Sequence, residues 1–309
     1  MHRRFRNISL IRFILTFCST AGTILALYFT FYFDAHMAWR EFALLDEHRH
    51  PTKSLDTMPE EELRELFHRM IAMPLWSDWL PYQYLFFLGD ESSVPLIINA
   101  MRWAPEPQYD PAELKTQASY AKKLQLRRPA ARKKVPTNWR EGFRALEHIT
   151  FQPLPPSHSV WDSWYQTNKH NSRFEWIIHG FNLRGVPLKS RPDTATINLL
   201  LEQLAVPDDY DTDDIRFIDW DRNQFHALWL LENADYGLVS NVVMQASELG
   251  TVPQRRGLAR YCRTIPDTVA PSERLLNRLT KDEDRMTRIL AAWARTNRIK
   301  ATNISPYNR

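Results

Sequence analysis

The feature that most constrains this chain is an uninterrupted stretch without charge near its N-terminus. The stretch extends from Phe13 to Phe33, between Arg12 and Asp34, and contains no acidic, basic or histidine residue. At about 1.5 Å rise per residue, a helix of this length crosses the roughly 30 Å hydrocarbon core of a bilayer. We therefore expect residues 13–33 to form a transmembrane helix.

A cleavable signal peptide is the main alternative for this stretch. The apolar region of a signal peptide usually has about 7 to 15 residues and ends at small residues in an A-x-A-like site. Here the stretch is longer, and Ala26 has the bulky Ile24 two positions before it. Aromatic residues from Tyr28 to Phe33 stand where an interfacial belt would lie. These observations favour an uncleaved anchor.

The flanking charges predict the direction of the anchor. Four arginines precede it: Arg3, Arg4, Arg6 and Arg12. Positive charge is retained on the cytoplasmic side of a membrane, so residues 1–12 are expected in the cytoplasm. This predicts a single-pass protein of the bacterial inner (cytoplasmic) membrane with a periplasmic, extracytoplasmic folded part. A cytoplasmic location of the folded part is the alternative.

The rest of the chain has the composition of a globular helical protein. It has 44% hydrophobic and 25% charged residues, with 8 Gly and 20 Pro in the whole sequence, which suits helices separated by proline-marked connections. We expect a juxtamembrane linker over 34–56, an all-α domain over 57–296 with a sub-boundary near 122–136, and a flexible tail over 297–309. Cys262 is expected to be a buried small hydrophobe.

Apolar residues recur at helical spacing in nearly every segment of the domain. Examples are Leu63, Leu66, Phe67 and Met70; Leu80, Tyr84, Phe87 and Leu88; Val94, Ile97, Ile98 and Met101; and Val239, Val242, Val243 and Ala246. Strict alternation is nowhere sustained, although 174–183 is ambiguous between helix and strand. Thr57 and Glu60 form a T-x-x-E capping box before the first of these stripes. The fold class is therefore all-α, with antiparallel helical hairpins.

One stretch carries a resemblance to a known family. Its residues are Arg144, Ala145, Leu146, Ile149 and Thr150, followed by Trp161 and Trp164. This order resembles a pattern in bacterial HEAT-like (armadillo-type) repeat proteins, in which an Ala-Leu…Leu-Thr helix end precedes a W-x-x-W helix. The chain departs from the pattern at Phe151, where a glycine is usual, and at Ser159 and Val160, where an acidic residue is usual. The resemblance implies a HEAT-like α-solenoid with a surface for other proteins and no catalytic residues, against an irregular helical bundle as the alternative.

An acidic run is the main candidate for a metal site, ahead of the H-x-H pair His48 and His50 in the linker. Asp209, Asp211 and Asp213 have the 1-3-5 spacing of a calcium loop. The glycine expected at the sixth position is Asp214, and the bidentate glutamate expected at the twelfth is Trp220. The sequence thus excludes an EF-hand and leaves a looser Ca²⁺ site as a weak candidate beside a solvated loop.

A basic block is the candidate for an anionic partner. Its residues are Lys122, Lys123, Arg127, Arg128, Arg132, Lys133 and Lys134. Outside the cytoplasm such a patch would meet lipid headgroups or anionic envelope polymers. It lacks the interleaved aromatic residues that stack on bases, so nucleic acid is not the expected partner. A solvated loop is the alternative.

Five of the eleven tryptophans fall into two groups. Trp139, Trp229 and Trp293 stand at stripe positions, which favours core packing. Trp161 and Trp164 are expected to be partly exposed, and they are candidates for a protein-partner or glycan surface.

No local catalytic motif is present in the sequence, which lacks H-E-x-x-H, G-x-S-x-G, Walker A and G-x-G-x-x-G patterns. A triad assembled from distant residues is left open, because triads are recognised by geometry. We therefore expect a membrane-anchored helical scaffold of the cell envelope that binds a protein partner, without catalysis or a cofactor. The alternative is an envelope glycan- or lipid-binding protein, or an enzyme, on the same all-α fold.

Overall fold

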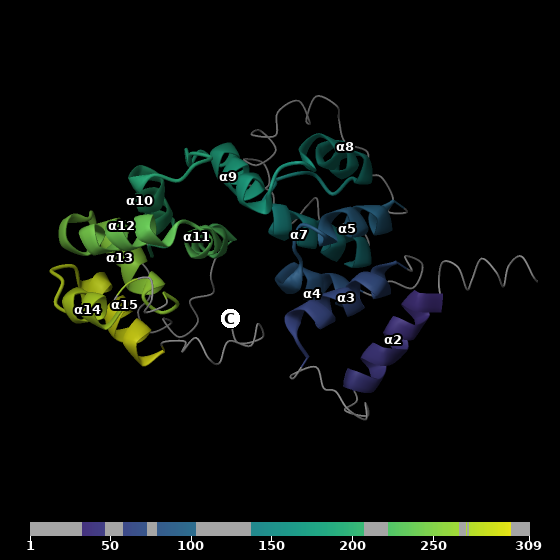
Figure 1. Ribbon diagram of the computed structural model, residues 1–309, viewed down its shortest axis with the longest axis horizontal. Helices are drawn as coiled ribbons and strands as arrows, with labels where there is room; N and C mark the ends of the chain where they lie inside the picture. Colours follow the sequence, from purple (N-terminus) through teal and green to yellow (C-terminus); the bar gives the residue numbers. More distant parts are fainter. Residues whose placement is uncertain are drawn as a thin grey trace, which may run out of the picture. The chain divides into compact units, whose positions relative to one another are not determined.

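The computed structural model describes residues 33–46, 58–72, 79–102, 137–206, 222–265, 270 and 272–297. In these residues all regular structure is helical, and no strand is present (Figure 1). The helices are α2 (Phe33–Asp46), α3 (Glu60–Ile71), α4 (Leu80–Leu88), α5 (Ser93–Met101), α7 (Thr137–Thr150), α8 (His158–Asn168), α9 (Arg173–Leu183), α10 (Thr194–Gln203), α11 (Arg222–Glu232), α12 (Tyr236–Leu249), α13 (Val252–Tyr261), α14 (Ser272–Leu279) and α15 (Arg285–Thr296).

The chain divides into two compact units. Unit 1 comprises Met1–Glu106 and Val135–Ala145, and unit 2 comprises Pro107–Lys134 and Leu146–Arg309. Helices α2 to α5 and the first part of α7 belong to unit 1, and α8 to α15 belong to unit 2. The division falls within α7.

Helix α3 is the centre of unit 1. It packs against α2, α4 and α5. Its predicted stripe is confirmed, because Leu63, Leu66, Phe67 and Met70 are all buried. The ring of Phe67 stacks on that of Tyr84 in α4, with centroids 4.3 Å apart. These contacts make α3 the element that ties α2 and α4 together.

The start of α3 corrects one prediction. The helix begins at Glu60 with Pro59 as its N-cap, and no side chain caps it. Glu60 thus takes the first helical position and not the third that the predicted capping box requires, while Thr57, the other member of that box, lies outside the described residues. Three glutamates in the first turn, Glu60 to Glu62, stabilise this end through the helix dipole instead.

Unit 2 is built from helices that pack as neighbouring pairs. Helix α12 packs against α13, and α14 packs against α15. Helix α13 also contacts α10 and α15, and α12 also contacts α14. The α12–α13 hairpin therefore meets the α14–α15 hairpin through both of its helices. Cys262 directly after α13 is fully buried, as predicted.

Side-chain caps define where most helices of unit 2 begin. In six of them the N-cap side chain accepts a hydrogen bond from a backbone N–H of the first turn, which satisfies a donor that has no partner within the helix. These caps are Ser157, Ser172, Asp193, Asp235, Thr251 and Asp284. The capping box of Ser172 and Glu175 starts α9, which settles the ambiguous stretch 174–183 as helix.

Among the helices that the structure describes, none has the length and apolar character needed to span a bilayer. The predicted span 13–33 lies outside the described residues except for Phe33, where α2 begins.

Candidate functional site

Two of the predicted sites lie outside the described residues. Asp209, Asp211 and Asp213 fall within 207–221, and the basic block falls within 103–136. In the part of the chain that the structure does describe, no group of three His, Cys, Asp or Glu residues is arranged to hold a metal ion.

The structure corrects the prediction that Trp161 and Trp164 are partly exposed. Trp161 is 1% exposed and Trp164 is 7% exposed, so neither presents a surface to a partner or glycan. Their spacing of three residues puts both indoles on one face of α8. That face meets Trp176 of α9, whose ring lies 5.4 Å from that of Trp164 in an edge-on arrangement. The W-x-x-W pair is thus an internal contact between α8 and α9.

The end of α7 has an unusual backbone. Phe151, which replaces the glycine of the HEAT-like pattern, has a φ of 58°, in the left-handed region that disfavours residues with a Cβ. Its ring is fully buried and stacks on the imidazole of His226, with centroids 4.1 Å apart. The guanidinium of Arg184 lies 3.8 Å from the ring centroid and also donates to the Phe151 carbonyl oxygen at 2.7 Å.

The histidines beside Phe151 form a buried structural cluster. His226 donates from Nε2 to the carbonyl oxygen of His148 at 2.6 Å, and the two rings lie 5.0 Å apart. Both residues are buried. Helix α9 approaches so closely that a Cβ at Gly180 would lie 2.3 Å from the Phe151 carbonyl oxygen. The cluster therefore joins α7, α9 and α11.

Unit 1 contains the side chains of a serine-hydrolase relay. His68 Nε2 lies 2.7 Å from the Ser93 hydroxyl oxygen, and His68 Nδ1 lies 3.7 Å from a Glu65 carboxylate oxygen. However, Ser93 is fully buried, and its oxygen accepts from the backbone N–H of Asp90 at 3.1 Å. A nucleophile must reach a substrate, so this group is a link between α3 and the start of α5.

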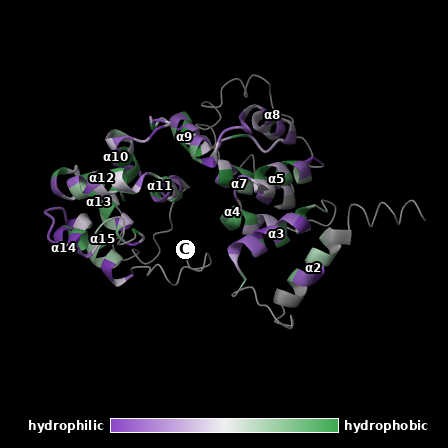
Figure 2. Cartoon of the chain, in the orientation of Figure 1, coloured by the Kyte–Doolittle hydropathy of each residue, from purple (hydrophilic) through white to green (hydrophobic). Residues whose placement is uncertain are grey.

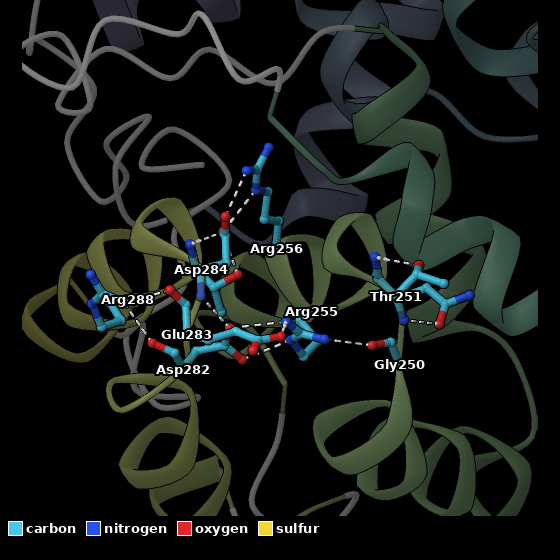
Figure 3. Close-up of polar contacts among 10 residues, drawn as sticks. Gly250, Thr251, Arg255, Arg256, Asp282, Glu283, Asp284 and Arg288 are labelled. Atoms are coloured by element: carbon cyan, nitrogen blue, oxygen red, sulfur yellow. Dashed lines mark hydrogen bonds and ion pairs between the residues drawn. The ribbon is translucent and has the colours of Figure 1, made fainter.

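A network of charges joins the turns of two successive hairpins (Figure 3). Arg256 in the middle of α13 binds both carboxylate oxygens of Asp284, from Nε at 2.9 Å and from Nη2 at 2.8 Å. Asp284 is also the N-cap of α15 and accepts from the backbone N–H of Thr287 at 2.7 Å. One carboxylate thus holds the beginning of α15 against the middle of α13.

The neighbouring Arg255 makes a second set of contacts in the same network. It donates to the carbonyl oxygen of Gly250 at 2.7 Å, and it pairs with Asp282 at 2.8 Å and with Glu283 at 3.0 Å (Figure 3). Gly250 lies in the turn between α12 and α13, and the two acids lie in the turn between α14 and α15. Arg255 therefore bridges two equivalent turns.

The electrostatics of this network follow from its ion pairs. The hydrogen bonds from Arg256 lower the pKa of Asp284, and those from Thr287 act in the same direction against the effect of burial. Burial would lower the pKa of Arg255, but its bonds to Asp282 raise it instead. Each group is thus held in its charged form, which suits a structural brace.

Helix α4 exposes an aromatic face. Trp79 is 40% exposed and Phe87 is 65% exposed. The sequence predicts an apolar stripe of Leu80, Tyr84, Phe87 and Leu88, whereas the buried residues are Pro81, Tyr82, Leu85 and Leu88. That prediction is wrong for Phe87, because a helix with eight apolar or aromatic residues out of nine has no periodicity to mark one face.

This surface is the strongest candidate for an interaction site in unit 1. We define the α4 face as Trp79, Gln83 and Phe87 with the half-buried Leu80 and Phe86. Figure 2 shows α4 largely in the green of hydrophobic residues. No residue from 80 to 89 carries a charge. This lack of charge was visible in the sequence, but the exposure that makes it significant was not.

A cation borders the α4 face. The guanidinium of Arg144 in α7 lies 5.8 Å from the Phe86 ring centroid, and the rings of Phe86 and Phe87 meet edge-on at 4.9 Å. Arg144 also donates to Glu141 at 2.8 Å, and Arg140 lies 3.4 Å from the same carboxylate. The face thus combines exposed aromatic rings with a small cluster of net positive charge.

No family model, no curated protein and no solved structure matches this chain.

Proposed function

We propose that this chain is a membrane-anchored helical scaffold protein of the cell envelope that binds a protein partner outside the cytoplasm. Residues 13–33 serve as its anchor, and unit 2 serves as a HEAT-like binding module. The observation that supports this proposal is the stacking of two successive hairpins, in which α12 contacts α14 and α13 contacts α15.

Stacking of this kind creates a continuous outer surface. Because equivalent helices of successive hairpins lie together, their solvent-facing residues form one extended face, which is how helical repeats bind proteins. On α12 the exposed residues include Asn241 and Gln245, and on α14 they include Arg274 and Asn277. An ion pair between Glu248 and Arg278 spans the two helices. The face formed by α12 and α14 is therefore the proposed partner surface.

The charged network between the turns supports a preorganised surface. Arg255 and Arg256 connect the α12–α13 turn to the residues before α15, which restrains one hairpin relative to the next. A surface that is rigid before binding loses less conformational entropy when a partner docks. The brace thus favours a binding role for the face that it supports.

Site-specific photo-crosslinking in living cells tests the proposal. A photoreactive residue replaces Gln245 on the α12 and α14 face in the full-length chain, and the matched control replaces Gln166, an exposed glutamine of α8. We expect a discrete heavier adduct from position 245 that is much weaker from position 166. Adduct levels at position 245 that match the unirradiated sample would contradict the scaffold function.

A further inference from the structure

The exposed apolar residues of the described chain gather in unit 1. Among the large hydrophobic residues of the described segments, four of the six exposed ones belong to this unit, and two belong to unit 2. They are Met37, Trp79, Phe87 and Leu96 in unit 1, and Tyr236 and Leu249 in unit 2. Trp79 and Phe87 lie eight residues apart, so they stand on the same side of α4 about two turns from each other.

The chemistry of the α4 face matches the interfacial zone of a bilayer. Tryptophan and phenylalanine are the side chains that favour the boundary between headgroups and acyl chains. The face contains one polar side chain, Gln83, and no charge. Arg144 lies beside it, and Arg140 and Arg144 share the carboxylate of Glu141. Guanidinium groups bind phosphate through paired hydrogen bonds. Aromatic rings bordered by arginines would therefore contact both layers of this zone.

The connectivity of unit 1 keeps the α4 face close to the predicted anchor. Helix α2 begins at Phe33, the last residue of the uncharged stretch. It packs against α3, and Arg69 of α3 bonds to Glu41 of α2 at 3.0 Å. Helix α3 packs in turn against α4. Since packed helices lie about 8–10 Å apart, α4 is about 20 Å or less from α2.

We propose that the α4 face inserts into the interfacial zone of the same membrane that holds the anchor. This inference rests on the anchor of the proposed function. The anchor makes insertion intramolecular, so a contact that would be weak for a free protein becomes populated. Arg140 and Arg144 then face lipid phosphates while Trp79 and Phe87 contact the acyl boundary. Unit 1 lies on the membrane surface as a result.

Depth-dependent quenching in lipid vesicles tests this proposal. The full-length chain carries Cys18→Ser and a single new cysteine with an environment-sensitive dye, either Phe87→Cys or the control Leu249→Cys. Both positions are strongly exposed, at 65% and 80%, and the native Cys262 is fully buried. Vesicles contain phosphatidylcholine and phosphatidylglycerol, with or without a lipid spin-labelled near the headgroup. We expect about twofold or greater quenching at position 87 and little at position 249.

The outcomes separate the inference from the proposed function. If the protein fails to float with the vesicles, the anchor is wrong, and the inference falls with it. If it floats but the dye at position 87 is quenched no more than at position 249, the inference alone is overturned. Protection of position 87 from both the spin-labelled lipid and aqueous iodide would instead assign the face to a protein or to a second copy of the chain. Gln83→Cys repeats the measurement without removing an aromatic ring.

Discussion

A single strained residue shows how packing determines local backbone geometry in this chain. A left-handed backbone at a residue with a Cβ costs about 1–2 kcal/mol, and Phe151 adopts it at the end of α7. The surrounding contacts offset that cost, because the ring is fully buried between His226 and Arg184. Phe151 thus combines the role of a helix-terminating glycine with that of a core aromatic residue.

The strain at Phe151 predicts that a glycine variant at this position is more stable than an alanine variant. Phe151→Ala loses the buried ring and keeps the unfavourable backbone, so it should lower the free energy of unfolding by about 3–5 kcal/mol. Phe151→Gly loses the same ring but relieves the strain, so it should be about 1 kcal/mol more stable than the alanine variant. Urea unfolding of the two variants in detergent gives the comparison. Equal stabilities, or a more stable alanine variant, would show that the backbone carries no strain.

The buried His68 predicts that stability decreases in mild acid. Burial lowers its pKa from the ordinary value of 6.5, against the opposing effects of Glu65 and Asp90. The unfolded chain therefore takes up a proton at a higher pH than the folded chain does. The contribution of His68 is complete above pH 6.5 and declines as the pH falls below that value.

The variant His68→Gln tests this dependence, because glutamine does not titrate and retains a polar group towards Ser93. Its denaturation midpoint should change less between pH 7.5 and pH 5 than that of the wild type, although its stability at neutral pH is expected to be lower. His179 also has a pKa lowered by burial. The denaturation midpoint of the double variant with His179→Gln should therefore change even less with pH. Parallel pH profiles for wild type and His68→Gln would show that protonation of His68 does not cause the loss of stability in mild acid.

At the scale of elements, the pairing of α10 with α13 depends on a glycine. A Cβ at Gly257 would lie 1.7 Å from the carbonyl oxygen of Leu201, so the two helix backbones are in direct contact at this point. Gly257→Ala must push the helices apart and should destabilise unit 2 by about 3 kcal/mol. The control is Gly237→Ala in α12, where the nearest atom is the Asp235 side chain at 3.3 Å. Thermal unfolding should show a clear loss for the first variant and little change for the second.

The ion pair between Arg256 and Asp284 predicts how much stability is lost when its charge is removed. Arg256 and Asp284 have side chains that are 11% and 15% exposed, so water screens their pairing only weakly. Asp284→Asn keeps a side chain that can cap α15 but loses the charge-assisted pair, and it should cost about 2 kcal/mol. The matched control is Arg278→Gln, which breaks the ion pair with Glu248. Those two side chains are 49% and 47% exposed, and such exposed pairs contribute about 0–1 kcal/mol.

The ion pair between Arg256 and Asp284 also predicts how the stability of the fold changes at acidic pH. Because Arg256 lowers the pKa of Asp284, the unfolded chain binds a proton at a higher pH than the folded chain does. The stabilisation is therefore complete above pH 3.8, the ordinary pKa of the group, and it is lost as the pH falls below that value. Urea midpoints of Asp284→Asn should fall less steeply over this acidic range than those of the wild type.

For the molecule as a whole, both proposals depend on the membrane topology, that is, on which side of the membrane the folded part lies. The arginines before residue 13 predict a cytoplasmic N-terminus and an exported C-terminus. A protease should cleave a C-terminal tag once the outer envelope is permeabilised and spare it in intact cells. If the tag stays protected until the inner membrane is lysed, the folded part is cytoplasmic. The basic block at 122–134 would then face the cytoplasmic leaflet.

The prediction of individual helices succeeded where polar and apolar residues alternate with the helical period. The stripes of α3, α5 and α12 are buried as expected. In α3 and α12, polar residues on the opposite side mark the solvent-facing side of the helix. It failed in α4, where nearly every residue is apolar. It also failed for Trp161 and Trp164, because exposure depends on whether α9 covers α8, and local spacing carries no information on that contact.

The sequence by itself determined the helical class of the described residues, because helical periodicity is local and relates residues within about one turn of each other. The tertiary structure alone decided which face of α4 reaches solvent, that Phe151 holds a left-handed backbone, and that Arg256 meets Asp284 across 28 residues. Each of these depends on contacts between segments that are distant in the chain. Packing sets such contacts by shape and charge, and no local pattern records them.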